Sequence, residues 1–151
     1  MAGLVDGADV LTPNLTEASI LTGIEYRGQD VDEAFVKENI DALLAMGAKT
    51  VVLKGIVHEG EKIIRNYVAE KGREGFTEVS GELLPYMLHG TGDLFASAML
   101  AAIMCERSLV DSVEFASSFV RDAMEVTLKQ PDFEMRGVSF ESVLGEVSAL
   151  L

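Results

Sequence analysis

A short glycine-rich turn contains the residues whose types and spacing best suit a chemical role. In the segment His89-Gly90-Thr91-Gly92-Asp93, two glycines flank a threonine where an apolar helix is predicted to begin. Glycine lets the backbone approach a ligand closely and adopt positive φ, and the N–H groups at a helix start favour an anion. Gly90, Thr91 and Gly92 therefore predict an anion hole whose backbone amides hold a phosphoryl group.

Asp93 places a carboxylate at this anion site, where a bound phosphate would repel it. The placement makes chemical sense if Asp93 accepts the proton of an attacking hydroxyl group. A structural interpretation stands beside this one, because an aspartate in the first turn of any helix is favoured by the helix dipole. Four residues alone favour the structural interpretation, since short motifs often match by chance.

Composition and charge narrow the possible functions. The chain has 151 residues, 48% of them hydrophobic and 25% charged, with a formal net charge of −13. This mixture predicts one globular domain and excludes disorder as the bulk state. The acidic balance argues against a nucleic-acid partner and a polybasic membrane surface. The single cysteine, Cys105, excludes an internal disulfide, favours a reducing cytoplasmic setting, and is expected in the core.

The elements that must position these residues alternate between strands and helices. Apolar runs and turn residues predict strands at 9–12, 50–53, 62–69 and 75–79, with a hairpin turn at 71–73. Caps and apolar periodicity predict helices from Thr16 to Gly23, Asp30 to Gly47, 93 to 105, Ser108 to about Lys129, and 139 to 150. The helix at 93–105 is apolar nearly all round and is expected to be buried on most sides. The alternation predicts an α/β layered domain with a largely parallel sheet.

Two further segments form a pattern together with the glycine turn. One is Ala8–Ala18, with an Asn-x-x-Glu pair at Asn14 and Glu17, and the other is Val51–Gly55. With Gly90–Ala96, in this order and spacing, they resemble the ribokinase-like superfamily and especially its pyridoxal kinase branch. The resemblance runs from about Ala8 to the C-terminus. It implies a three-layer, Rossmann-like α/β fold with a mostly parallel sheet flanked by helices.

The resemblance implies roles for the residues of the glycine turn. Asp93 matches the base that deprotonates the hydroxymethyl group of a B6 vitamer, which then attacks the γ-phosphate of ATP. The amides of 90–92 match those that stabilise the transferring phosphoryl group. Asp93 followed by Leu94-Phe95 favours the pyridoxal or pyridoxamine branch, because hydroxymethylpyrimidine kinases often have Gly-Thr-Gly-Cys and sugar kinases usually have Gly-Ala-Gly-Asp.

The resemblance also implies a nucleotide and metal site. Asn14 and Glu17 match a pair that places Mg²⁺ and phosphate, usually through water, which suits an ion that keeps several waters. Thr12 and Lys54 match positions that contact ATP. Each has a structural alternative: Asn14 as a turn or helix cap, Glu17 as a first-turn residue, and Lys54 as a solvated strand end.

Members of this family are considerably longer, and the chain matches their C-terminal, nucleotide-side half. We expect this half alone to lack activity, because phosphoryl transfer depends on positioning both substrates. We also expect self-association, as in a homodimer, because an uncovered parallel-sheet edge is a template for pairing. Two alternatives stay open: a hydroxymethylpyrimidine or sugar kinase of the same superfamily, and a non-catalytic α/β module for nucleotide binding or assembly.

Overall fold

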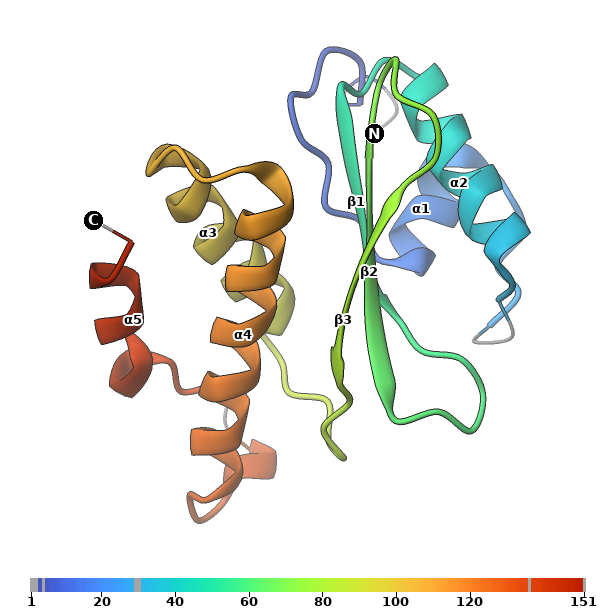
Figure 1. Cartoon of the computed structure of the whole chain (residues 1–151). Coiled ribbons are helices and arrows are strands. Elements are labelled where there is room, and N and C mark those ends of the chain that lie inside the picture. The colour runs from blue at the N-terminus through green and yellow to red at the C-terminus, as the bar shows by residue number, and fades with distance from the viewer. Residues whose placement is uncertain (1–2, 4, 29–30, 136, 151) are drawn as a thin grey trace. The chain divides into compact units, whose positions relative to one another are not determined.

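The computed structural model describes residues 3, 5–28, 31–135 and 137–150. The chain divides into two compact units, Met1–Leu83 and Leu84–Leu151. The first unit contains a small sheet with helices α1 (Leu15–Thr22) and α2 (Glu33–Ala45). The second is helical, with α3 (Thr91–Met104), α4 (Leu109–Leu128), α5 (Gly145–Ser148) and the short 3₁₀ helices η2 (Phe133–Met135) and η3 (Glu141–Val143) (Figure 1).

The sheet of the first unit consists of β1 (Thr50–Ile56), β2 (Ile63–Glu70) and β3 (Thr77–Glu82), in the order β1-β2-β3. Both strand pairs are antiparallel, so the prediction of a largely parallel sheet is wrong for these strands. The connections at 57–62 and 71–76 are too short for a parallel crossover, which takes roughly a dozen residues or more. The predicted hairpin around 71–73 is confirmed.

The strand predicted at 9–12 is reduced to isolated parallel bridges beside β1, which pair Leu11 with Val51 and Asn14 with Lys54. The N–H of Leu11 donates to the carbonyl of Thr50 at 2.9 Å, and the carbonyl of Leu11 accepts from Val52 at 2.7 Å. Pro13 has no N–H to continue this ladder, although its carbonyl accepts the Lys54 N–H at 2.9 Å. Among the described residues, the predicted parallel relation is therefore found in this segment alone.

Helices α1 and α2 cover the same face of the sheet (Figure 1). The apolar residues of α2 recur at helical spacing and pack in one buried cluster with side chains of β1 and α1, among them Phe35, Val36, Ile40, Leu43, Val51, Leu53, Ile56, Leu15 and Ala18. The predicted cap of α2, Asp30, lies outside the described residues. The N-cap is Asp32, whose carboxylate accepts the N–H of Phe35 at 2.8 Å.

Gly47 follows the end of α2 with φ +111°, as expected of a glycine just past a helix C-terminus. A Cβ at this position would lie 2.3 Å from Oδ1 and 2.9 Å from Cα of Asp6. The absence of a side chain therefore permits both the left-handed turn and a close approach of two backbone segments. Gly23, the predicted end of the preceding helix, caps α1 in the same left-handed region.

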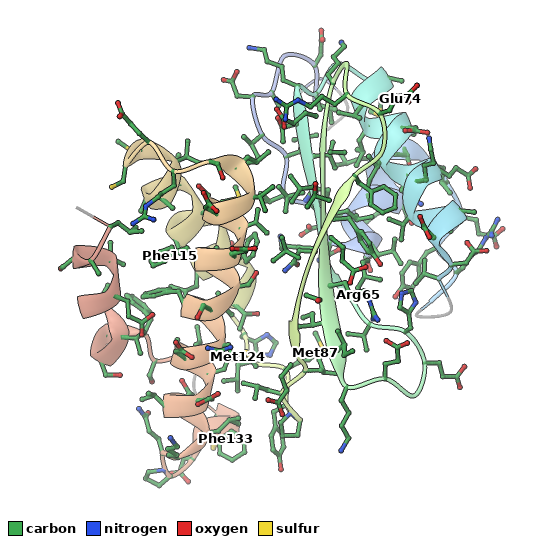
Figure 2. The ribbon with its side chains drawn as sticks, viewed as in Figure 1. Arg65, Glu74, Met87, Phe115, Met124 and Phe133 are labelled. Atoms are coloured by element: carbon green, nitrogen blue, oxygen red, sulfur yellow. The ribbon has the colours of Figure 1, made fainter. Side chains whose placement is uncertain are left out.

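The second unit confirms α4 and corrects its neighbours. Ser108 caps α4 by accepting the Asp111 N–H at 3.2 Å. Phe115 of α4 stacks on Phe119, with ring centroids 5.9 Å apart, and Figure 2 shows Phe115 on the α5 side of α4. Helix α3 is not buried on most sides, since Leu100 is 56% exposed and Met104 is 77% exposed. Among the described residues, no helix is long and apolar enough to cross a membrane.

The single amphipathic helix predicted at 139–150 is wrong. The segment forms η3 and then α5, a helix of only four residues. In a continuous helix over 139–150, Gly145 would lie in the interior, where glycine is about 1 kcal/mol less favourable than alanine. A regular apolar pattern does not reveal this cost, and a short helix gains little from its own hydrogen bonds.

Candidate functional site

The predicted site residues are divided between the two units. Thr12, Asn14, Glu17 and Lys54 belong to the first unit, and the glycine turn with Asp93 belongs to the second. Each group includes a helix start, and the first group also includes Lys54 of β1.

In the first unit, Asn14 and Glu17 form a reciprocal cap at the start of α1. The Asn14 side chain accepts the N–H of Glu17 at 2.8 Å, and the Glu17 carboxylate accepts the N–H of Asn14 at 2.8 Å. This is the capping box, which satisfies two backbone donors at a helix start. The structural interpretation of both residues is therefore confirmed. A carboxylate has several acceptor positions, so this role leaves room for another.

The side chain of Lys54, near the end of β1, lies beside this cap. Its ammonium donates to the backbone carbonyl of Thr12 and lies 3.9 Å from Oε2 of Glu17. The Lys54 side chain is only 16% exposed, whereas that of Glu17 is 54% exposed. The alternative of a solvated strand end is therefore wrong for Lys54. The parallel bridge between Asn14 and Lys54 sets this arrangement, and it gathers the four predicted residues of this unit into one cluster.

The charges of this cluster suit a phosphate together with a water-held cation. A lysine ammonium and the start of α1 both favour an anion. The donor set also fits Mg²⁺ held mainly through water, because Glu17 and Asn14 offer hard oxygen atoms and Mg²⁺ needs few protein carboxylates. In the part of the chain that the structure describes, no group of three or more His, Cys, Asp or Glu residues is placed to hold a metal directly.

In the second unit, the glycine turn begins α3. Gly90 is the N-cap with φ +90°, in the left-handed region, and no side chain caps the helix at that position. Helix α3 begins two residues before the predicted start, so Thr91, Gly92 and Asp93 form its first turn. Asp93 is exposed and its structural interpretation as a first-turn acid is confirmed. The same placement leaves its carboxylate accessible to a hydroxyl substrate.

Residues 138 and 139 support the glycine turn, a contact that the sequence did not predict. The carbonyl of His89 accepts the N–H of Val138 at 3.1 Å, and the Oγ1 of Thr127 accepts the N–H of Ser139 at 2.8 Å. Thr127 is fully buried on α4. A polar residue at an apolar position of an amphipathic helix was the one available signal for it. Cys105, expected in the core, instead ends α3 as a half-buried C-cap.

Solved structures with the same fold define the class. A putative phosphomethylpyrimidine kinase from Bacteroides thetaiotaomicron, crystallised with pyridoxal, aligns with a TM-score of 0.87 at 27% identity, over 97% of this chain and 51% of that chain. The Staphylococcus aureus pyridoxal kinase in complex with AMP-PCP and pyridoxal aligns with a TM-score of 0.76 at 26% identity, over 93% and 50%. The fold is therefore the ribokinase-like α/β fold, as expected.

Sequence comparison assigns the family. The model of the phosphomethylpyrimidine kinase family matches residues 1–136, and the chain belongs to this family. It is 31% identical over 140 residues to the pyridoxal kinase PdxY of Actinobacillus succinogenes, covering 89% of this chain and 48% of that protein. It is 33% identical over 131 residues to the hydroxymethylpyrimidine/phosphomethylpyrimidine kinase of Bacillus subtilis, covering 83% and 44%. The chain thus spans about half the length of the curated relatives it matches.

Proposed function

We propose that the protein is an ATP-dependent kinase that phosphorylates the 5′-hydroxymethyl group of pyridoxal, pyridoxamine or pyridoxine. The observation that carries this proposal is the placement of Asp93, an exposed carboxylate in the first turn of α3, directly after the left-handed Gly90. Relatives named pyridoxal kinase support the choice of substrate. Residues 1–151 would form the nucleotide-side part of the kinase domain.

In the proposed reaction, Asp93 accepts the proton of the substrate hydroxyl group. The hydroxyl oxygen attacks the γ-phosphorus of ATP, the bond to the β,γ-bridging oxygen breaks, and ADP leaves. The backbone amides of Gly90, Thr91 and Gly92 stabilise the charge on the transferring phosphoryl oxygens. Such amides are fixed before the reaction, so they lower the barrier without reorganising.

The cluster of the first unit would bind the nucleotide. Lys54 is placed to hold a phosphate oxygen, beside the backbone of Thr12. Glu17 and Asn14 would hold Mg²⁺ through water, and the ion when bound would neutralise phosphate charge. The capping box would hold the side chains of Asn14 and Glu17 in place before the nucleotide binds.

A hydroxymethylpyrimidine kinase is the second candidate, because the family model and the Bacillus subtilis relative carry that description. The two candidates differ only in the acceptor. In the whole enzyme, ADP release in the presence of pyridoxal, pyridoxamine, pyridoxine, hydroxymethylpyrimidine and ribose separates them and tests a sugar kinase as well. Faster release with hydroxymethylpyrimidine than with any B6 vitamer would overturn the first choice.

Calorimetry with Mg·ATP tests the nucleotide site of this chain directly. Binding without turnover supports the assignment to the nucleotide-side part, and the absence of binding favours an assembly module and overturns the kinase proposal. A homodimer in a cytoplasmic setting is part of the proposal. Light scattering over a concentration series tests the self-association, and a monomer at every concentration would contradict it.

A further inference from the structure

We propose that Asn66 is a positioning residue for nucleotide binding, acting on Lys54 through the backbone of Gly55. Asn66 lies on β2, is 6% exposed, and its Oδ1 accepts the N–H of Gly55 at 3.0 Å. Gly55 directly follows Lys54 on β1. The inference rests on the proposed function, because the position of Lys54 matters for nucleotide binding only if Lys54 holds a phosphate oxygen.

The contact is part of a bulge in the β1–β2 pair. The register pairs Leu53 with Tyr67 and then Ile56 with Arg65. Lys54 and Gly55 therefore oppose the single residue Asn66. Gly55 has φ +76°, a conformation that glycine adopts without strain. An extra residue in one strand leaves a backbone N–H without its ladder partner, and here the Asn66 side chain supplies the acceptor.

The bulge changes which side chains reach which face of the sheet. Val51, Leu53 and Ile56 belong to the same buried cluster. Strict alternation would place Leu53 and Ile56 on opposite faces, because successive strand residues alternate. The bulge therefore returns Ile56 to the core after Lys54 has pointed to the other face. The bulge thus has two consequences: it keeps Ile56 in the core, and it affects the direction of the Lys54 side chain.

Other contacts fix the chain on each side of the bulge. Its N–H donates to the carbonyl of Pro13 at 2.9 Å, and its ammonium donates to the carbonyl of Thr12. On the far side of the bulge, Arg65 (labelled in Figure 2) bridges two carboxylates, those of Glu61 at 2.6 Å and Glu78 at 3.2 Å. Because the flanks are fixed, the path between them depends on the contact from Asn66 to Gly55. Bulges occur often beside active sites, where they redirect a side chain.

The test compares two substitutions of similar shape, Asn66→Leu and Asn66→Asp. Leucine removes the acceptor for the Gly55 N–H, and aspartate keeps it. The dissociation constant of Mg·AMP-PCP is measured by calorimetry. We expect Asn66→Leu to weaken binding about three- to tenfold, the worth of one hydrogen bond, and Asn66→Asp to bind more tightly than Asn66→Leu. Unchanged binding by Asn66→Leu would overturn the proposal.

Asn39→Leu is the matched control. Asn39 is fully buried on α2, and its Nδ2 donates to the carbonyl of Phe35 at 3.0 Å. Its Oδ1 is buried without a hydrogen-bond partner, so this variant should shift the urea midpoint without changing the dissociation constant. An equal loss of affinity in Asn39→Leu would mean that a general effect of replacing a buried asparagine, and not positioning, explains the loss.

A second measurement separates this proposal from the proposed function. If the unsubstituted chain does not bind Mg·AMP-PCP, the proposed function fails. The NMR signals of Lys54 and Thr12 in the nucleotide-free chain still report the positioning. Asn66→Leu should shift both signals and speed hydrogen exchange of the Gly55 amide, while Asn39→Leu leaves them in place. Signals that stay unchanged in Asn66→Leu would overturn the role of Asn66 by themselves.

Discussion

Glu17 combines a structural role with a proposed role in nucleotide binding, and the substitutions Glu17→Gln and Glu17→Ala separate the two. Its carboxylate accepts the N–H of Asn14 at 2.8 Å and lies 3.9 Å from the ammonium of Lys54. Glutamine keeps a side-chain carbonyl that accepts the same N–H, so it preserves the capping box. Alanine removes both the cap and the charge.

The expected stability changes follow from these contacts. Loss of a capping partner costs about 0.5–2 kcal/mol. The pair with Lys54 adds little, because Glu17 is 54% exposed and exposed pairs contribute about 0.2–1 kcal/mol. Glu17→Gln should therefore lower the free energy of unfolding by less than about 1 kcal/mol, and Glu17→Ala by about 1–2 kcal/mol. Urea unfolding measures both values.

The binding changes should follow a different order. Both variants lose the charge that would hold Mg²⁺ through water, and a charged hydrogen bond is worth roughly 1.5–3 kcal/mol, so each should bind Mg·ATP at least about tenfold more weakly. With EDTA present, neither variant should bind free ATP more weakly than the parent chain, because a carboxylate repels the bare triphosphate. Glu38→Gln, at an exposed position of α2, is the control and should change nothing.

The two interpretations of Glu17 predict opposite patterns. If Glu17→Gln binds Mg·ATP as tightly as the parent chain while Glu17→Ala does not, Glu17 serves only as a cap. The reasoning would then fail at the metal site while the description of α1 stands.

Three further predictions concern the glycine turn and the glycine that follows α2. In the whole enzyme, Asp93→Asn should lower the rate of ADP release by about 10²–10⁴-fold while the affinity for ATP is nearly kept, and an unchanged rate would refute its role as the base. Gly47→Ala should cost about 2–5 kcal/mol, from the left-handed backbone and the overlap with Asp6, whereas Gly23→Ala should cost only about 1–2 kcal/mol because its Cβ meets nothing within 4 Å; urea unfolding compares them. Thr127→Val should cost about 1–3 kcal/mol and Thr127→Ser much less, since serine keeps the hydroxyl that accepts the N–H of the supporting segment; equal thermal shifts would contradict this.

Local signals in the sequence predicted several helix ends correctly. Ser108 was predicted to begin a helix and is the N-cap of α4. Gly23 was predicted to end a helix and is the C-cap of α1. These signals work because capping depends on residues within one turn of each other. The direction of strand pairing is not local, and alternation alone suggested a parallel sheet where short connections impose an antiparallel one. The prediction of one helix over 139–150 was wrong for a related reason, because apolar periodicity does not report helix length.

The residue types of the candidate site could be predicted from the sequence, but the contacts that hold these residues in place could not. The motif at Asn14 and Glu17 is visible in the sequence, and so is the glycine turn. Lys54 is mostly buried and donates to the Thr12 carbonyl, 42 positions away in the sequence, because a parallel bridge brings the two segments together. No pattern within a single element encodes such a contact. Asn66 and Thr127 were missed because a polar residue within an apolar pattern looks like an irregularity.

The two overlooked residues share one physical role. Asn66 and Thr127 are both buried, and the oxygen of each side chain accepts a backbone N–H, from Gly55 and from Ser139. Each accepted N–H lies beside a segment that carries a proposed site residue. A buried acceptor is costly to leave unpaired, so each contact strongly favours one backbone path. The groups proposed to do the chemistry, Glu17 and Asp93, are exposed and lie in the first turns of helices. Substitutions of the buried pair should therefore disturb the position of the site, and substitutions of the exposed pair should disturb its chemistry.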